Sequence, residues 1–135
     1  MADGIQWDDL IARSKAHGFL AWQLYAIFTT PAGGFEDLEG VLASHLEYQV
    51  DLERRGIMFA AGPLSDADGK VWKGRGLIVV RAGSLQEARR LAEADPMHSS
   101  GVRQFEIVPW CVNEGGLDLR LNYSNGTFEF KPRRD

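Results

Sequence analysis

His45 and Asp95 are the residues of this sequence whose types and positions best suit proton-transfer chemistry. His45 lies on the apolar side of a predicted helix, and Asp95 ends a second predicted helix, directly before Pro96. A carboxylate that accepts a hydrogen bond from an imidazole fixes the tautomer of the ring and favours its charged form. The pair could therefore act as a general base. Two structural interpretations stay open: His45 as a core histidine with one hydrogen bond, and Asp95 as a helix-end residue bonded to local amides.

His98 is a second histidine close to this pair, three residues after Asp95 in the sequence. Together with His45 and Asp95 it could form a set of two histidines and one carboxylate, which suits a divalent metal ion. A histidine on an exposed loop can also be simply solvated. We expect no metal and assign His98 to the candidate substrate-binding residues.

The loop between Gly62 and Arg75 holds the other candidate binding residues. Ser65 and Asp66 are typical turn residues that could also reach a pocket. Trp72 and Arg75 could recognise an aromatic or anionic ligand by stacking and charge, although a long loop also needs an anchor and a solvated cation. We assign all four to substrate binding.

The composition excludes several other classes of protein. The 135 residues suffice for one core, and 44% hydrophobic with 25% charged residues is an ordinary globular balance. A net charge of -4, without a long basic run, disfavours nucleic acid as a partner. Gly69, Gly74 and Gly76 form no phosphate-binding loop, because no Lys-Ser or Lys-Thr pair opens a helix after them. We therefore expect no nucleotide and no other cofactor.

Cysteine content and hydropathy bear on the compartment. The single cysteine, Cys111, excludes an intrachain disulfide and a multi-cysteine zinc site. No run approaches the ~20 apolar residues that span a bilayer. Residues 1–18 are acidic and amphipathic, whereas a signal peptide is basic and then continuously apolar. We expect a cytoplasmic protein that binds no membrane.

The hydrophobic pattern predicts the elements that must position these side chains. Runs rich in aromatic and β-branched residues predict strands, and apolar residues at helical spacing predict helices. The predicted strands are 21–30, 57–61, 76–82 and 103–110, and the predicted helices run from Glu36 to Gly56 and from Ser84, an N-cap, to Asp95. The core thus has the order β-α-β-β-α-β.

Two segments flank this core, which we place at about residues 21–110 of a single domain, 1–135. Residues 1–20 contain a short amphipathic helix that ends near Gly18. Residues 111–135 contain an alternating hairpin whose Asn125-Gly126 pair predicts a tight type I′ turn. A disordered tail is the alternative for this last segment.

With right-handed crossovers, this order gives a ferredoxin-like α+β fold, an antiparallel sheet with both helices on one face. The helices then run antiparallel, so residues near 55 and near 85 lie at one level. Ten residues along each helix correspond to about 15 Å, which makes His45 and Asp95 neighbours. The loops 31–35, 62–75 and 97–101 should form walls around the pair, as loops commonly surround chemical sites.

A sheet covered by helices on one side leaves its other face exposed to water. Trp22, Leu24, Phe105 and Ile107 stand at alternate strand positions and could supply an apolar surface there. We therefore expect a homodimer that forms through this face.

Several short segments of the sequence together resemble a known family. In chain order they are His45-Leu46-Glu47-Tyr48, Gly56, Ala61-Gly62-Pro63-Leu64, Ser84-Leu85-Gln86-Glu87-Ala88-Arg89, Ala94-Asp95-Pro96, Ser100-Gly101-Val102 and Pro109-Trp110. Their order resembles that of YCII-related (YciI-like) proteins over residues 21–110. The resemblance implies a ferredoxin-like fold, dimers of the dimeric α+β barrel kind, and a His-Asp catalytic pair at His45 and Asp95. One branch of the family dehydrochlorinates a chlorinated aromatic, and the barrel superfamily includes lactone isomerases and cofactor-free monooxygenases.

The sequence thus favours a cofactor-free enzyme in which His45, supported by Asp95, moves a proton on a small organic substrate. The substrate would be aromatic or a lactone, and the reaction of isomerase, lyase or hydrolase type. The alternatives are a metabolite-binding or assembly module of the same fold without catalysis, and a metal-dependent variant. An enzyme needs an open cavity that reaches the imidazole, whereas a structural pair would be sealed by side chains.

Overall fold

The structure of the protein is a computed structural model that describes residues 3–34 and 36–131. It divides into two compact units, one formed by residues 22–111 and the other by residues up to 21 together with those from 112 onward. The larger unit covers nearly the segment that the sequence assigns to the core, 21–110.

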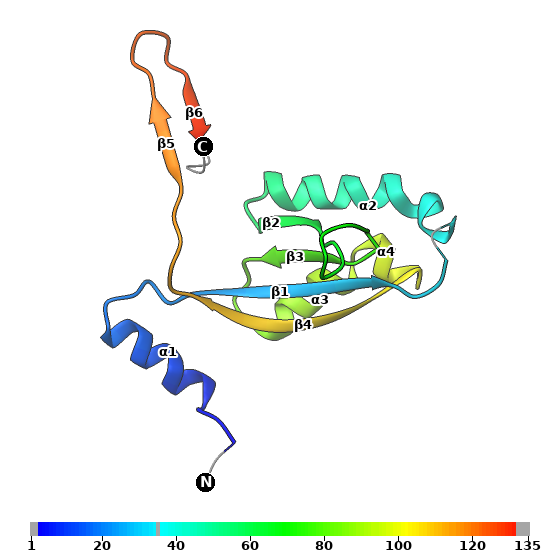
Figure 1. The fold of residues 1–135 in the computed structure, drawn as a ribbon, viewed down its shortest axis with the longest axis horizontal. Coiled ribbons are helices and arrows are strands. Elements are labelled where there is room, and N and C mark those ends of the chain that lie inside the picture. Colours follow the sequence, from blue (N-terminus) through cyan, green and yellow to red (C-terminus); the bar gives the residue numbers. More distant parts are fainter. Residues whose placement is uncertain (1–2, 35, 132–135) are drawn as a thin grey trace. The chain divides into compact units, whose positions relative to one another are not determined.

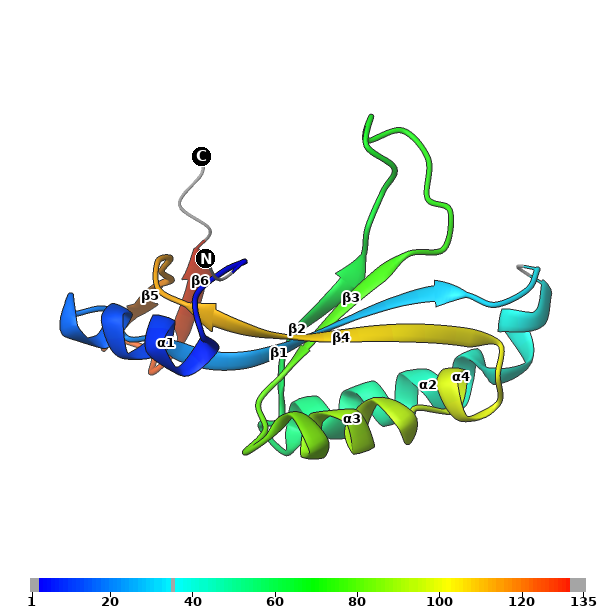
Figure 2. The same cartoon turned by 90° about the horizontal axis from the view of Figure 1, so that it is seen from below.

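The larger unit is a four-stranded sheet with its helices on one face (Figures 1 and 2). Its elements are β1 (Trp22–Pro31), α2 (Glu36–Arg54), β2 (Met58–Pro63), β3 (Gly76–Val80), α3 (Leu85–Glu93), α4 (Pro96–Ser99) and β4 (Arg103–Val112). The strand order is β2-β3-β1-β4, and β3 runs antiparallel to both β1 and β2. This is the ferredoxin-like α+β fold that the element order predicts.

Local signals set two helix ends where the sequence predicts them. At the end of α2, Gly56 adopts φ +74°, which lets the following N–H reach the Leu52 carbonyl at 2.9 Å. At the start of α3, the Ser84 hydroxyl accepts the Glu87 N–H at 3.1 Å, and the Glu87 carboxylate accepts the Gly83 N–H at 2.7 Å. Both caps satisfy backbone groups that the helix itself leaves unpaired.

The core lies between the sheet and α3. Its sheet side is formed by cross-strand pairs of β1 and β3, Tyr25 with Val80 and Ile27 with Ile78. The buried cluster consists of Tyr25, Ile27, Ile78, Val80, Ala88, Ala92 and Ile107. The alanines on the sheet-facing side of α3 let this helix approach the strands closely.

The predicted dimer surface is wrong for two of its four residues. Ile107 belongs to the core and Phe105 packs against the same cluster, so both face the helices. Trp22 and Leu24 stand an odd number of positions from Tyr25 on β1, so they face the other side of the sheet. Alternation within a strand is visible in the sequence, but the face that turns toward the helices depends on how the strands pair.

The smaller unit contains α1 (Trp7–Ala16) and a hairpin of β5 (Asp118–Leu121) and β6 (Phe128–Lys131). As predicted, α1 ends near Gly18, whose φ is +87°. The Asn113 amide donates to the Ser14 hydroxyl of α1 at 3.1 Å. No helix in the described ranges combines the length and the apolar character that crossing a membrane requires.

The hairpin is present, but its turn is not the predicted type I′ turn. That turn needs a positive φ at both Asn125 and Gly126, and of the two only Gly126 has one, at +67°. The observed loop is longer: Asn122 N–H donates to the Thr127 carbonyl at 2.8 Å, and Gly126 N–H donates to the Asn122 carbonyl at 3.0 Å. The Asn125 side chain stabilises this loop, because it accepts hydrogen bonds from the N–H and hydroxyl of Thr127.

Candidate functional site

His45 and Asp95 lie in direct contact, as the helix lengths predict. His45 Nδ1 lies 2.8 Å from Asp95 Oδ1 and 2.9 Å from Oδ2. His45 comes from the middle of α2, and Asp95 caps α4 by accepting the Met97 N–H at 2.9 Å. This cap, with Pro96 next to it, turns residues 96–99 into a helical turn where the sequence predicted only a loop.

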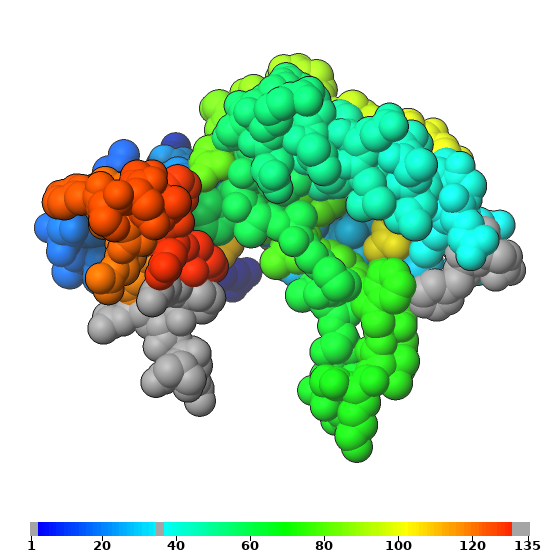
Figure 3. Space-filling view, turned by 90° about the horizontal axis from the view of Figure 1, so that it is seen from above, coloured from blue at the N-terminus to red at the C-terminus, as the bar shows by residue number. Residues whose placement is uncertain are grey.

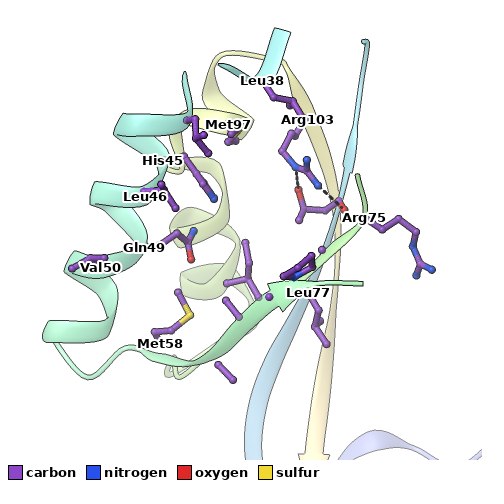
Figure 4. Close-up of a pocket in the computed structure, with 18 of the residues that line it drawn as sticks. Leu38, His45, Leu46, Gln49, Val50, Met58, Arg75, Leu77, Met97 and Arg103 are labelled. Carbon is purple, nitrogen blue, oxygen red and sulfur yellow. Dashed lines mark hydrogen bonds between the residues drawn. The ribbon is translucent and has the colours of Figure 1, made fainter. Parts of the chain in front are cut away.

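The contact determines which ring nitrogen of His45 is available. An ionised carboxylate can only accept, so Nδ1 carries the proton and donates it to Asp95. In the neutral ring Nε2 then has a lone pair, and no described residue hydrogen-bonds to it. Figure 4 shows the ring pointing from α2 into the cavity beside it. The imidazole is thus oriented as a base toward the cavity.

Asp95 is held in its ionised form. Burial alone would raise the pKa of this carboxyl, but hydrogen bonds from His45 and Met97 and the charges of His45 and His98 outweigh burial and lower it. Gln49 Nε2 donates to Oδ2 of the same carboxylate at 2.8 Å. Asp95 is 1% exposed, so solvent does not compete for these bonds.

Two further side chains of α2, those of Tyr48 and Gln49, help to hold His45 and Asp95 in place. The Tyr48 hydroxyl donates to the Leu91 carbonyl at 2.7 Å and ties α2 to α3. Because the Gln49 amide group donates to Asp95, its Oε1 points elsewhere, and this buried oxygen has no partner among the described residues. Gln49 is therefore a polar residue of the site that the sequence did not reveal.

The cavity measures about 1220 Å³ and lies between α2 and the sheet. Figure 3 shows the hollow between α2 (cyan) and the hairpin that joins β2 to β3 (green). Its lining is mainly apolar, with His45, Gln49 and Arg103 among the polar residues. The lining residues are Thr29, Leu38, Glu39, Leu42, His45, Leu46, Gln49, Val50, Glu53, Met58, Phe59, Ala60, Ala61, Gly62, Pro63, Ser65, Trp72, Arg75, Gly76, Leu77, Ile78, Met97 and Arg103.

Three of the four candidate loop residues line this cavity. They are Ser65, Trp72 and Arg75, although the Arg75 guanidinium points away from the cavity (Figure 4). Asp66 does not line it: its carboxylate accepts the N–H groups of Lys70 at 3.0 Å and of the next residue at 3.3 Å. These bonds, that of Lys70 first, lower the pKa of Asp66. Asp66 is thus the turn residue of the alternative interpretation, and residues 31–34 do not line the cavity either.

His98 lies behind the cavity wall, not on it. Its Nδ1 donates to the Ala92 carbonyl at 2.7 Å, and its Nε2 accepts from the Thr29 hydroxyl at 2.9 Å. The ring packs on Phe105, with the ring centroids 4.8 Å apart. Both ring nitrogens are in use, so His98 has none left for a metal or a substrate. In the described part of the chain, no group of three His, Cys, Asp or Glu side chains could hold a metal ion.

Arg103 is a second polar lining residue that the sequence did not reveal. It opens β4, is 8% exposed and donates to both the hydroxyl and the carbonyl of Thr29. The sequence does contain a sign of this position. Residue 103 lies two and four residues before Phe105 and Ile107, which face the helices, so alternation along the strand places Arg103 on the same face. An arginine at an inward position of a strand is unusual and could have been noticed.

The buried position of His98 predicts an acid-sensitive fold. Burial, the largest cause, lowers the pKa of His98, as do the charges of Arg103 and His45, while Ala92 and Asp95 act in the opposite direction. Between its ordinary value near 6.5 and the lower folded value, the unfolded chain binds a proton that the native chain does not. The free energy of unfolding should therefore fall as the pH drops below about 6.5.

Urea denaturation between pH 8 and pH 5 measures this dependence. His98→Gln should flatten it, because the titrating ring is gone, whereas His17→Gln, which replaces an exposed histidine, should leave it unchanged. A wild-type protein that grows more stable from pH 7 to pH 5.5 would contradict the assignment.

Comparisons with known proteins place these residues in a wider context. The model of the YCII-related domain family matches residues 23–111. The uncharacterized protein YjpA of Bacillus subtilis (strain 168) is 38% identical over 71 residues, 51% of this chain and 74% of that protein. The 5-chloro-2-hydroxyhydroquinone dehydrochlorinase TftG of Burkholderia phenoliruptrix AC1100, solved in complex with 2,5-dihydroxybenzoquinone, has a similar structure. It is 23% identical with a TM-score of 0.52, covering 68% of this chain and 95% of that one.

Proposed function

The chain belongs to the YCII-related family, and on this premise we propose that it is a cofactor-free enzyme that uses His45 and Asp95 for acid–base chemistry. The proposal rests on the different surroundings of the two ring nitrogens of His45. Nδ1 is held by a buried carboxylate, whereas the ring edge with Nε2 lines an open cavity. A general base needs this combination of fixed orientation and access to substrate.

The proposed reaction is a proton transfer on a small unsaturated ring, aromatic or lactone. Nε2 of His45 takes a proton from the substrate, and Asp95 stabilises the resulting imidazolium through the Nδ1–H bond. The proton then returns to another atom of the substrate in an isomerisation, or passes to the leaving group or to solvent in an elimination. In a hydrolysis, Nε2 instead takes the proton from the attacking water and passes it to the leaving group. The apolar lining suits an unsaturated ring.

The activity named for the structural neighbour TftG indicates which compounds to test first as substrates. TftG is described as a dehydrochlorinase that acts on a chlorinated hydroxyhydroquinone. Hydroxylated six-membered rings, with and without a chlorine substituent, are therefore the first compounds to test. Unsaturated five-membered lactones come second, because their ring hydrogens are removed by the same kind of base.

The open cavity supports a role of His45 at a ligand over a purely structural pair. A pair that served only to join α2 to α4 would need no access from outside. Here the His45 side chain retains 21% of its exposure, whereas Asp95 retains 2%. The pair thus has one buried member and one member within reach of a ligand.

A substrate screen tests the proposal. Wild-type protein is incubated with the two groups of rings in D₂O, and conversion, chloride release and deuterium incorporation at carbon are followed by NMR. We expect turnover or exchange that His45→Gln reduces by about 10²-fold or more and His17→Gln leaves unchanged. Equal rates in wild type and His45→Gln would contradict the role of His45.

We also propose that the enzyme is a homodimer that uses the sheet face away from the helices. Trp22, Phe59 and Trp110 form an aromatic cluster, with ring centroids 5.2 Å apart for the first two and 6.4 Å for the last two. Trp110 is 42% exposed. Val108, two residues earlier on the same strand and therefore on the same face of the sheet, is 43% exposed. Large apolar side chains on one sheet face are typical of an association surface.

Val108→Glu should convert the dimer to a monomer, because a carboxylate placed in an apolar interface lacks a partner. Sedimentation velocity at tens of micromolar measures the change, and Gln86→Glu, at an exposed position of α3 on the helix side of the sheet, is the control. A wild-type protein that sediments as a monomer would rule the dimer out.

A further inference from the structure

Arg103 is a buried cation whose hydrogen bonds occupy only part of its guanidinium. Its Nε donates to the Thr29 hydroxyl at 2.8 Å, and its Nη2 donates to the Thr29 carbonyl at 3.1 Å and to the Gly74 carbonyl. Guanidinium carries five N–H donors. In residues 3–34 and 36–131, nothing accepts a hydrogen bond from Nη1. The residue itself lines the cavity, and Figure 4 shows it reaching from β4 toward the space between α2 and the sheet.

The described residues give this cation no ion-pair partner. Asp95 is near enough to affect the guanidinium electrostatically, but its carboxylate is bonded to His45, Gln49 and the Met97 N–H. Burial lowers the pKa of Arg103, and the charge of Asp95 opposes that effect. A buried charge without a bonded counter-ion is unfavourable, and an anionic ligand would relieve this.

The acidic residues that line the cavity do not fill this role. Glu39 and Glu53 both belong to α2 and are exposed, so water and salt screen their charges. Arg103 is buried, so its charge is screened much less. The inner part of the cavity is therefore the part in which a negative group would be favoured.

A chain of hydrogen bonds holds the guanidinium in place. Arginine only donates, so the Thr29 hydroxyl accepts from Arg103 and donates its own hydrogen to His98 Nε2. The proton on His98 Nδ1 in turn goes to the Ala92 carbonyl. Gly76 leaves room for this arrangement, because a Cβ there would lie 3.1 Å from Thr29 Cγ2. These bonds leave the remaining edge of Arg103 as the one available to a ligand.

We propose that Arg103 binds an anionic oxygen of the substrate, a carboxylate or an ionised ring hydroxyl, across the cavity from His45. This inference rests on the proposed function and adds the substrate class, an unsaturated or aromatic ring acid. When His45 Nε2 takes a proton from carbon, the C–H electron pair forms a C=C bond. The π electrons of a C=O group conjugated to that carbon then move onto its oxygen, which becomes an ionised ring hydroxyl. The guanidinium stabilises the negative charge on that oxygen.

Calorimetric titration with matched pairs of ligands tests the inference without any turnover. The probes are benzoate with benzamide and 2-naphthoate with 2-naphthamide, which differ in charge but little in shape. Wild type should bind each carboxylate about tenfold or more tightly than its amide, since a hydrogen bond to a charged partner is worth that ratio. Arg103→Gln should lose this preference while it still binds the amides. Arg90→Gln, which removes an exposed cation of α3 outside the cavity, should keep it.

A structural role for Arg103 would give a different result. If Arg103 only joins β1 to the end of the β2–β3 hairpin, Arg103→Gln lowers the affinity for acid and amide equally, which would overturn the inference. If Arg103→Gln does not fold, Arg103→Lys, which keeps the charge, should retain part of the preference. The inference is also overturned if a folded Arg103→Lys binds the amides tightly but shows no preference for the carboxylates. A wild type that prefers the amides, or that binds neither kind of probe, overturns it as well.

The failure of this inference and that of the proposed function can be told apart. Carboxylate preference in wild type and in His45→Gln, without turnover of any compound, would leave the anion site standing and remove the enzyme. His45-dependent turnover of neutral rings, without carboxylate preference, would leave the enzyme standing and remove the anion site.

Discussion

Asp95→Asn is expected to lower the rate of turnover by about 10³–10⁴-fold while the protein stays folded. The asparagine oxygen can still accept the Met97 N–H, because asparagine caps helices as well as aspartate does. Its NH₂ group then faces His45 Nδ1 and donates to it, so the ring proton moves to Nε2 and the cavity loses its base. Gln49 can turn its amide so that its unpartnered oxygen accepts from the asparagine.

The measurement is kcat with the first substrate found, together with urea denaturation of the same samples. Asp51→Asn is the matched control: Asp51 also lies on α2, but it bonds only to Arg54 and Arg55 at the exposed end of the helix. The control should keep the wild-type rate. Undiminished turnover in Asp95→Asn would show that the carboxylate does not support His45.

Leu52→Ala is expected to lower the free energy of unfolding by about 2–5 kcal/mol. Leu52 is 2% exposed and anchors the end of α2 against the sheet, while most of the helix surface is in contact with water. Truncation removes apolar burial and leaves a cavity beside a small void of about 10 Å³ that already exists there. Because α2 also carries His45, ligand affinity should fall as well.

Leu46→Ala on the same helix is the control, since Leu46 is 51% exposed and its loss should cost about 0.5 kcal/mol or less. Both variants are compared by chemical denaturation at one pH. Equal destabilisation by the two substitutions would mean that α2 is not anchored through Leu52.

The sequence determined the parts of this protein that local signals control. The strand and helix order follows from hydrophobic spacing, and Gly56 and Ser84 end and begin helices because a cap involves only neighbouring residues. The contact between His45 and Asp95 could also be predicted, since two antiparallel helices of known length fix the height of each residue. Their catalytic role stays a prediction.

Which polar side chains reach the cavity depends on how distant segments of the chain pack together. Arg103, Thr29 and Gly74 are far apart in the sequence, and their contact depends on the pairing of the strands and the path of the β2–β3 hairpin. His98 was expected at the ligand, but both of its ring nitrogens are taken by groups from β1 and α3. The positions of Arg103 and His98 are set by hydrogen bonds between segments that are distant in the sequence. The hydrophobic pattern of one segment does not reveal which donors and acceptors another segment will place beside it.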